Sequence, residues 1–473
     1  MEILLWIFIV IVFYSYAGYG IILIINKKAA FLQRIFHKPF NSIASEIISE
    51  PNEYRPKVTL IISASGENRS IIREKIANTN ELNYPRDNFE VIFAIAYDKN
   101  SETDETIEEY YNSMGSGFDF TKFTSKDQEV YVKFLDMDKE ETGVRDSEIL
   151  ENLSKVLQSD LFSTDEITEG AKEKLDEINQ AGSGKELIIR VTKDIERKGK
   201  ISQVNRTVNR AEGEIIVFSD ANTMFNEEAI VNIVRHFADK RVGCVAGEKR
   251  VKKGVNSTSG EGEGLYWKYE SLLKKLDSDL YTTVGAAGEI FAVRKELFQE
   301  GIDPNALIED FVVSMKIAQK GYRVIYEPEA YAEEEPTFDL KSEFIRRRRI
   351  AAGGFQAIVW LRELLNPIKY GVLSFQYISH RVLRWAVVPF LLPLILLLNI
   401  LLIPQGAVYG LLFAIQVIFY LLAFVGYFLE LKKRKIKIFY FPFLLMMMNA
   451  AAYSGIKRYL KGEQQVVWEK VKR

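Results

Sequence analysis

Apolar residues follow two different patterns along this chain. Runs at residues 3–25, about 383–403, 407–430 and 437–456 are almost continuously apolar, and each is long enough to cross about 30 Å of hydrocarbon as a helix. Between the first run and the others, from residue 56 to about 340, short apolar runs alternate with segments of helical periodicity. This alternation is typical of an α/β domain with a mostly parallel sheet and helices on both faces.

The short apolar runs predict strands, and the amphipathic segments between them predict helices. Strands are expected at 58–63, 89–96, 187–192, 214–219, 242–246 and 323–326. Helices are expected at 68–79, 201–211, 226–238, 264–276 and 309–320. Gly321 stands where a helix C-cap glycine belongs, just before the last of these strands.

Residues 112–185 interrupt this rhythm, because they are acidic and favour helix. The capping-box pattern at 163–166 and the Gly-Ser-Gly stop at 182–184 predict two or three helices inserted at one edge of the sheet. Two interpretations of this insertion stay open, a solvated decoration and a lid or partner-docking element.

The first apolar run is predicted to be an uncleaved membrane anchor. Its basic residues Lys27, Lys28 and Arg34 follow the run, whereas those of a signal peptide precede it. By the positive-inside rule, the N-terminus then lies outside, and the domain that follows is cytoplasmic at the inner cell membrane.

The charges near the C-terminal runs conflict with this rule. Residues 432–435 and the tail from Lys457 are both basic, although a span at 437–456 would place them on opposite sides of the membrane. Either this run is a true span, or it is a re-entrant or interfacial hairpin. The preceding segment 343–380 mixes Arg with large apolar residues, as do amphipathic helices at a membrane surface and helices that close a soluble domain.

The predicted organisation therefore has six parts. They are an anchor at 1–26, a linker at 27–56, a cytoplasmic α/β domain at 57–342, amphipathic interface helices at 343–380, spans at 383–457 and a basic tail at 458–473.

The composition narrows the chemistry that the α/β domain can perform. A formal net charge of -2 argues against a nucleic-acid partner, which usually requires a basic face. Cys244 is the single cysteine, which excludes an intrachain disulfide, and three separated histidines provide no zinc motif. Any metal is therefore expected to be Mg²⁺ or Mn²⁺ held by oxygen. Cys244 and His236 themselves are expected in the core or on the surface.

Two carboxylates are the strongest candidates for chemistry. Asp220 begins an Asp-Ala-Asn sequence at the end of the strand expected at 214–219, and open α/β sheets bind ligands at the carboxyl ends of their strands. The carboxylate oxygens of Asp220 and the amide oxygen of Asn222 suit a hard divalent cation. Asp310, preceded by Glu309, can serve as a general base from a later loop. Taken alone, Asp220 also fits a turn or helix cap, and Glu309-Asp310 an acidic pair at a helix N-terminus.

The order of the motifs resembles that of membrane-bound family 2 glycosyltransferases, the group that holds cellulose, hyaluronan and poly-N-acetylglucosamine synthases. The matching elements are the loop Ser63-Ala64-Ser65-Gly66-Glu67, a turn at Asp98, Gly199-Lys200, Asp220-Ala221-Asn222, Ile308-Glu309-Asp310 and Arg346-Arg347-Arg348-Arg349. The resemblance runs from about residue 57 to 360 apart from the insertion. It implies a GT-A-type, Rossmann-like fold and inverting transfer of a sugar from a nucleotide-sugar donor, expected to be a UDP-sugar, to a glycan or lipid-linked acceptor.

The resemblance also implies a role for each matching residue. Asp310 would be the general base with Glu309 beside it, and Asp220 and Asn222 would hold the metal. The donor nucleotide is expected to contact Ser63, Ser65, Glu67, Asp98, Lys200, Asp220 and Arg349. The acceptor side is expected to include Trp267, Gly285, Gly288 and Arg346. From the residues alone, Asp98 also fits a turn, Lys200 a surface lysine, Trp267 a core residue and the Arg run a headgroup-binding patch.

The sequence departs from the family pattern at three places. Ser63 and Ser65 replace the Pro and Tyr of Pro-Ala-Tyr-Asn-Glu, and Asn222 replaces a second carboxylate. These two changes leave open an inactive nucleotide-sugar-binding assembly subunit. Arg346 and Ile350 replace the Gln and Trp of Gln-x-x-Arg-Trp, a motif of processive members. A non-processive transferase and a processive exopolysaccharide synthase that also translocates its product therefore both remain open.

Overall fold

The chain folds into two compact units. The helical unit comprises Met1–Ile48, His236–Gly288 and Asn305–Arg473, and the sheet unit comprises Ser49–Arg235 and Glu289–Pro304. The computed structural model of the protein describes residues 1–29, 31–35, 50–64, 67–95, 128–133, 188–193, 200–252, 259–298, 301–335, 340–432, 434 and 436–462.

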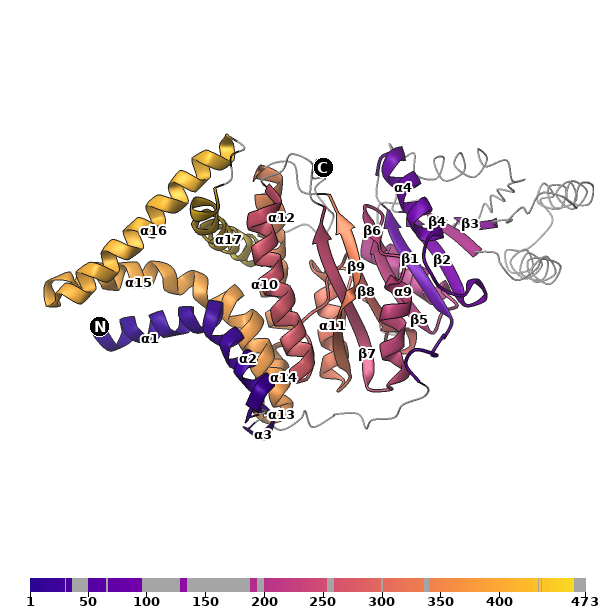
Figure 1. Ribbon diagram of the computed structural model, residues 1–473, viewed down its shortest axis with the longest axis horizontal. Helices are drawn as coiled ribbons and strands as arrows, with labels where there is room; N and C mark the ends of the chain where they lie inside the picture. The colour runs from indigo at the N-terminus through magenta and orange to yellow at the C-terminus, as the bar shows by residue number, and fades with distance from the viewer. Residues whose placement is uncertain are drawn as a thin grey trace, which may run out of the picture. The chain divides into compact units, whose positions relative to one another are not determined.

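The sheet unit is built on strands in the order β3-β4-β2-β1-β5-β8 (Figure 1). Their bounds are β1 Val58–Ala64, β2 Phe89–Ile95, β3 Gln128–Lys133, β4 Ile188–Lys193, β5 Ile215–Asp220 and β8 Ile290–Arg294. β1 pairs in parallel with β2 and β5, and β2 with β4, whereas β3 and β8 run antiparallel to β4 and β5. β2 is buried along its whole length, as expected for a strand with both faces covered.

Three helices, a short strand and two 3₁₀ turns complete the described part of the sheet unit. The helices are α4 Arg69–Asn80, α8 Lys200–Arg210 and α9 Ala229–Val234, the strand is β6 Thr223–Phe225, and the turns are Arg86–Asn88 and Lys295–Phe298. Asn68 is the N-cap of α4, and its side chain accepts a hydrogen bond from the amide of Ile71 at 3.0 Å, which satisfies one unpaired amide of the first turn. α8 lies against β1 and β2 through a buried stripe that includes Ile201, Val204 and Val208.

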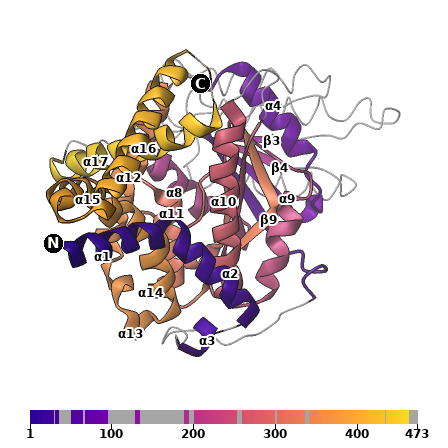
Figure 2. The same cartoon turned by 60° about the vertical axis from the view of Figure 1, so that its left-hand side comes forward.

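Two parallel strands lie within the helical unit. β7 Val242–Val251 and β9 Arg323–Glu334 pair in parallel, with register shifts at Val242/Cys244 and Gly247/Glu248. α11 Glu309–Gln319 and α10 Ser259–Leu280 both pack on these strands, and α10 also contacts α2 Tyr19–Ala29. Figures 1 and 2 show α10 alongside β9 in both views. Gly321, with φ +97°, follows the last turn of α11 as a C-terminal glycine.

Among the described residues, four helical segments are long and apolar enough to cross a membrane: Glu2–Lys27, Val372–Gln405, Ala407–Leu431 and Lys437–Leu460. The first contains α1 Glu2–Phe13, a π-helical segment Tyr14–Gly18 and α2. The second contains α14 Val372–Tyr377, a π-helical segment Ile378–Val387, α15 Val388–Leu402 and a 3₁₀ turn Ile403–Gln405. The other two are α16 Ala407–Leu431 and α17 Lys437–Leu460. Leu5 of α1, Leu391 and Ile395 of α15 and Tyr409 of α16 belong to one apolar cluster.

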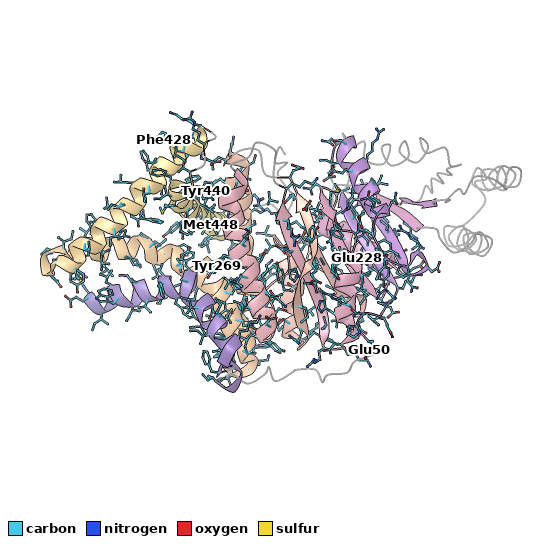
Figure 3. The ribbon with its side chains drawn as sticks, viewed as in Figure 1. Glu50, Glu228, Tyr269, Phe428, Tyr440 and Met448 are labelled. Carbon is cyan, nitrogen blue, oxygen red and sulfur yellow. The ribbon has the colours of Figure 1, made fainter. Side chains whose placement is uncertain are left out.

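α12 Leu340–Trp360 packs against the last apolar helix, α17. Tyr440 and Met448 of α17, labelled in Figure 3, lie in an apolar cluster that also contains Phe344 of α12. A Cβ on Gly455 would lie 2.5 Å from the carbonyl oxygen of Arg348, so glycine is required for the approach of the two helices. The remaining short elements are α3 Phe31–Ile35, α13 Pro367–Tyr370, and 3₁₀ turns at Arg235–Ala238 and Arg362–Leu365.

Each predicted strand and helix is present, with ends shifted by a few residues and with α10 and β9 longer than expected. Three strands within the described residues, β3, β6 and β8, were not predicted. β6 and β8 are short, and β3 lies inside the insertion 112–185, which the sequence assigned to helices alone. The rest of the insertion lies outside the described residues. α17 is one continuous helix of 24 residues, which does not fit a re-entrant hairpin. The side of the membrane on which the α/β part lies stays a prediction.

Candidate functional site

In the sheet unit, three of the predicted donor residues, Ser63, Lys200 and Asp220, lie at the carboxyl edge of the parallel strands. Ser63 on β1 and Asp220 on β5 are register partners. The amide of Ala221 continues this pairing by donating to the carbonyl oxygen of Ser63 at 3.0 Å. Ligands of open α/β sheets bind at this edge, because loops and helix N-termini converge there.

Lys200 brings a positive charge to the same place. It is the first residue of α8, and its Nζ lies 2.7 Å from Oδ1 of Asp220. Both side chains are partly exposed, 19% and 24%, so the pair is open to solvent and to ligands. A lysine beside an exposed carboxylate at a helix N-terminus can neutralise both the carboxylate and an incoming phosphate.

The turn that carries Asp220 and Asn222 is braced from behind by Lys75 of α4. The ammonium of Lys75 donates to the hydroxyl of Ser219 at 2.8 Å and to the carbonyl oxygen of Thr223 at 2.6 Å. It also lies 4.4 Å from the ring centroid of Phe225. Burial lowers the pKa of Lys75 to about 7, although nearby Asp220 acts in the opposite direction.

Asn78, one turn further along α4, fixes the strand that follows this turn. Its side chain donates to the carbonyl oxygen of Phe225 at 2.7 Å and accepts from the amide of Phe225 at 2.8 Å. Ala221 and Thr223 are fully buried. The backbone around Asp220 and Asn222 is therefore held rigidly, as a binding site that must present oxygens in fixed directions requires.

The oxygens at this turn fit a hard divalent cation. Asp220 supplies a carboxylate and Asn222 an amide oxygen, and Mg²⁺ and Mn²⁺ prefer such ligands together with water and phosphate. No cluster of three or more His, Cys, Asp or Glu side chains that could hold a metal occurs within the described parts of the chain. Asp220 and Asn222 together therefore fit a cation that is shared with a bound diphosphate.

In the helical unit, the predicted base lies against a glycine turn. Asp310 is in the first turn of α11, and a Cβ on Gly288 would lie 3.5 Å from its Oδ2. Gly285 has φ +93°, and a Cβ there would lie 2.2 Å from the ring of Phe311. The amide of Ala286 donates to the hydroxyl of Ser314 at 3.0 Å. The structure thus places Gly288 beside Asp310 and Gly285 beside Phe311.

The segment that leads into Asp310 is held by α12. A Cβ on Gly353 would lie 2.8 Å from the side chain of Ile308, so only glycine permits this approach. Gln356 accepts from the amide of Leu307 at 3.0 Å and donates to the carbonyl oxygen of Asn305 at 3.0 Å. α12 therefore fixes the backbone that enters the first turn of α11.

Arg346 forms an ion pair within α12. Its guanidinium lies 3.0 and 3.2 Å from the two carboxylate oxygens of the buried Glu343, and Arg347 contacts the same carboxylate at 2.7 Å. Burial would raise the pKa of Glu343, but the two arginines outweigh it and lower the pKa to about 2. Arg349, predicted to face the diphosphate, is half-buried on the same helix.

Other predicted site residues are placed only in part. Glu67 is half-buried just before α4. Glu309 is the first residue of α11. Ser65, Asp98 and the side chain of Trp267 lie outside the described residues. Cys244 is buried in β7, as expected, and Nε2 of His236 lies 2.6 Å from the carboxylate of Glu327.

Lys75, Asn78, Gly353 and Gln356 were missed by the sequence analysis. A signal existed for two of them. Lys75 falls on the apolar stripe of α4 between Ile72 and Thr79, a position that a solvated lysine would avoid. Gly353 is one of two adjacent glycines within a helical segment, which usually indicates close packing.

The family model for glycosyl transferase family group 2 matches residues 215–453. This is just over half of the 473 residues, so the chain belongs to this family. The match begins at β5, which carries Asp220, and ends within α17.

Two groups of known proteins are similar to this chain. The poly-β-1,6-N-acetyl-D-glucosamine synthase of Staphylococcus aureus strain COL is 27% identical over 180 residues, 37% of this chain and 42% of that protein. The enzyme of the same name from Staphylococcus epidermidis is 23% identical over 213 residues, 43% of this chain and 51% of that protein. The chain thus spans about half the length of these relatives, or less.

A solved structure confirms the predicted GT-A fold. The mannosyltransferase PcManGT of Pyrobaculum calidifontis, in complex with GDP-Man and Mn²⁺, superimposes with a TM-score of 0.58. The alignment covers 97% of this chain and 99% of the mannosyltransferase at 18% identity. The likeness extends to the apolar helices at both ends of the chain.

Proposed function

We propose that this protein transfers a sugar from a nucleotide-sugar donor to a glycan or lipid-linked acceptor at a membrane by an inverting displacement. The observation that carries the proposal is the meeting of Ser63, Lys200 and Asp220 at the carboxyl edge of the parallel strands. A carboxylate and a cation held side by side there suit a diphosphate and its metal. Asp310, set against Gly288 at the start of α11, supplies the base.

The proposed reaction is a single displacement at the anomeric carbon. Asp310 accepts the proton of an acceptor hydroxyl as that oxygen forms its bond to the anomeric carbon. The bond from this carbon to the donor phosphate breaks, and its electron pair leaves with the nucleoside diphosphate. Lys200 and Arg349 stabilise the departing charge, which is often the largest catalytic contribution. A divalent cation bound at Asp220 and Asn222 would neutralise the diphosphate further.

The glycines of the acceptor side complete the proposed site. Because Gly288 has no side chain, an acceptor hydroxyl can approach the carboxylate of Asp310 closely. Each half of the site is rigid by itself, through Lys75 in the sheet unit and through α12 in the helical unit.

The proposed location is the inner cell membrane, with the α/β part cytoplasmic. This proposal is supported by the four apolar helical segments and by the basic residues that follow the first of them.

A polymerising function is the second candidate. The curated relatives are named as poly-β-1,6-N-acetyl-D-glucosamine synthases, which favours an N-acetylglucosamine donor and a polymer product. The absence of Gln and Trp from the motif at 346–350 favours a non-processive reaction.

Membranes that contain the protein can be tested with radiolabelled UDP-N-acetylglucosamine, UDP-glucose and GDP-mannose in the presence of Mn²⁺ or Mg²⁺. Transfer to a lipid or short glycan supports the non-processive enzyme, and a high-molecular-weight product supports the polymerase. If no donor is transferred or hydrolysed while nucleotide still binds, the protein is an assembly subunit and the proposed function is wrong.

A further inference from the structure

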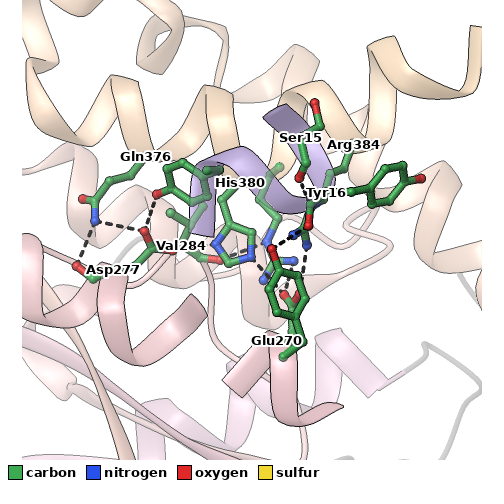
Figure 4. Close-up of polar contacts among 11 residues, drawn as sticks. Ser15, Tyr16, Glu270, Asp277, Val284, Gln376, His380 and Arg384 are labelled. Atoms are coloured by element: carbon green, nitrogen blue, oxygen red, sulfur yellow. Dashed lines mark hydrogen bonds and ion pairs between the residues drawn. The ribbon is translucent and has the colours of Figure 1, made fainter. Parts of the chain in front are cut away.

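A cluster of charged side chains is buried within the helical unit. Glu270 and Asp277 lie on α10, and His380, Arg381 and Arg384 lie on the π-helical segment of the second apolar span. Figure 4 shows His380 between the two carboxylates. Glu270, Asp277 and His380 are almost completely buried. Buried charges persist only when they are paired, so each contact in this cluster has a structural consequence.

The cluster is densely paired. Nδ1 of His380 lies 2.5 Å from Asp277, and its Nε2 lies 3.1 Å from Glu270. Arg381 and Arg384 each contact one oxygen of Glu270, at 2.6 and 3.0 Å. Burial alone would raise the pKa of Glu270, but Arg381, His380 and Arg384 outweigh it and hold the pKa well below its usual range.

The two arginines differ in their second contact. Nε of Arg384 donates to the carbonyl oxygen of Ser15 at 3.0 Å, in the π-helical segment of the first apolar span. Nε of Arg381 donates instead to the carbonyl oxygen of Val284 at 3.1 Å. Val284 begins the glycine turn Val284–Gly288 that lies against Asp310 and Phe311. One arginine thus ties the cluster to the first span, and the other ties it to the acceptor-side turn.

Neighbouring residues of the same span support the contact made by Arg381. Tyr377 and Trp385 lie four residues before and after Arg381, and both rings contact Phe311, with centroids 6.4 and 5.1 Å apart. The guanidinium of Arg381 lies 5.5 Å from the ring of Trp385. This face of the span therefore contacts the residue that directly follows Asp310 as well as the turn opposite it.

We propose that Arg381 is a positioning residue that holds the Val284–Gly288 turn against Asp310 and so links the second membrane span to sugar transfer. This inference rests on the proposed function in that Asp310 is taken as the base. The guanidinium of Arg381 is fixed by Glu270 and in turn fixes the carbonyl oxygen of Val284. This contact restrains the turn, and so sets the distance from Gly288 to the Asp310 carboxylate. Small displacements of reacting groups cost up to about a hundredfold in rate.

Arg381→Lys and Arg384→Lys form a matched pair of variants. Each keeps a positive charge beside Glu270, and each loses the Nε donor of the guanidinium. We expect Arg381→Lys to lower kcat for transfer at least about tenfold, with nucleotide affinity within about twofold of wild type. Arg384→Lys should keep kcat within about threefold, since its second contact goes to the first span and not to the turn.

Hydrogen exchange of the full-length protein in detergent gives a readout that does not depend on activity. Arg381→Lys should increase amide exchange in peptides that cover 284–288, and Arg384→Lys should increase it in peptides that cover 13–20. Equal losses of kcat in both variants, unchanged exchange at 284–288 in Arg381→Lys, or a looser turn with wild-type kcat would each overturn the inference. If wild type transfers no sugar while Arg381→Lys still loosens the turn, the proposed function fails and the anchoring of the turn stands.

Discussion

The ammonium of Lys200 lies 2.7 Å from the carboxylate of Asp220, at the carboxyl end of β5 and the amino end of α8. The pair is a pre-formed contact between the proposed metal ligand and the proposed phosphate cation. A donor diphosphate with its metal would exchange this contact for two others, metal to Asp220 and phosphate to Lys200. Substitution of Asp220 should therefore affect metal binding first, and substitution of Lys200 should affect nucleotide binding first.

Asp220→Asn is expected to lower Mn²⁺-dependent nucleotide binding by at least about tenfold, because the hard cation loses its anionic ligand. Lys200→Met should weaken nucleotide diphosphate binding while Mn²⁺ binding in the presence of nucleotide remains. Isothermal titration with UDP and GDP, with and without Mn²⁺, measures both effects. If Mn²⁺ strengthened nucleotide binding equally in Asp220→Asn and in wild type, Asp220 would not be the metal ligand.

Asp310→Asn is expected to reduce sugar transfer by about 10²–10⁴-fold, the range contributed by a general base. Nucleotide binding should stay close to wild type, since the donor residues lie on other elements. Asp279→Asn is the matched control, because it makes the same chemical change at a solvent-facing ion pair with Lys27 and Lys275. Transfer by Asp310→Asn at a rate near that of the control would contradict the assignment.

Lys75 should make the free energy of unfolding depend on pH. Its folded-state pKa is about 7, below the ordinary value of 10.5. Between these values the unfolded chain binds one proton more than the folded chain, so stability rises with pH, by up to about 1.4 kcal/mol per pH unit. Below pH 7 both states are protonated, and this contribution is flat.

Lys75→Met should remove that slope, and Lys275→Met, which alters an exposed lysine, should keep it. Urea unfolding, followed by circular dichroism from pH 6 to 10, gives the difference in the free energy of unfolding between each variant and wild type. If the free energy of unfolding changed with pH in the same way for wild type and Lys75→Met from pH 6 to 10, the buried amine would not titrate in this range.

Gly285→Ala should destabilise the acceptor-side turn. The backbone has φ +93°, and the new methyl group would meet the ring of Phe311. Overpacking and left-handed strain together cost roughly 2–4 kcal/mol. Gly410→Ala, in α16 with no atom within 4 Å of the added Cβ, should be neutral. Thermal unfolding and kcat report the effect, and equal behaviour of the two variants would contradict the close packing of Gly285 on Phe311.

The sequence predicts the sheet well where apolar runs are continuous. β1, β2 and β5 are buried along nearly their whole lengths, and their hydrophobicity alone marks them as central strands. Once they are parallel neighbours, Ser63 and Asp220 must end at the same edge. β8 escaped prediction because its five residues resemble many other short apolar runs, and its antiparallel direction depends on a partner distant in sequence.

The supporting residues of the site could not be predicted, because their partners are far away along the chain. Glu270 and His380 are separated by 110 residues, and neither has an unusual local pattern. Lys75 acts through Ser219 and Thr223, more than 140 residues later. A charged residue on a helix is solvated in most proteins, so only the tertiary fold shows that these side chains are buried and paired.

The central claim is that Asp220 holds the metal and diphosphate of the donor and that Asp310 is the base that acts on the acceptor. A structure of the full-length protein with Mn²⁺ and a non-hydrolysable nucleotide-sugar tests it most directly. We predict Mn²⁺ bonded to Asp220 and to the diphosphate, Lys200 moved onto a phosphate oxygen, and the Asp310 carboxylate facing the anomeric carbon opposite the diphosphate. A metal bound away from Asp220, or an Asp310 carboxylate directed away from the donor sugar, would contradict the account.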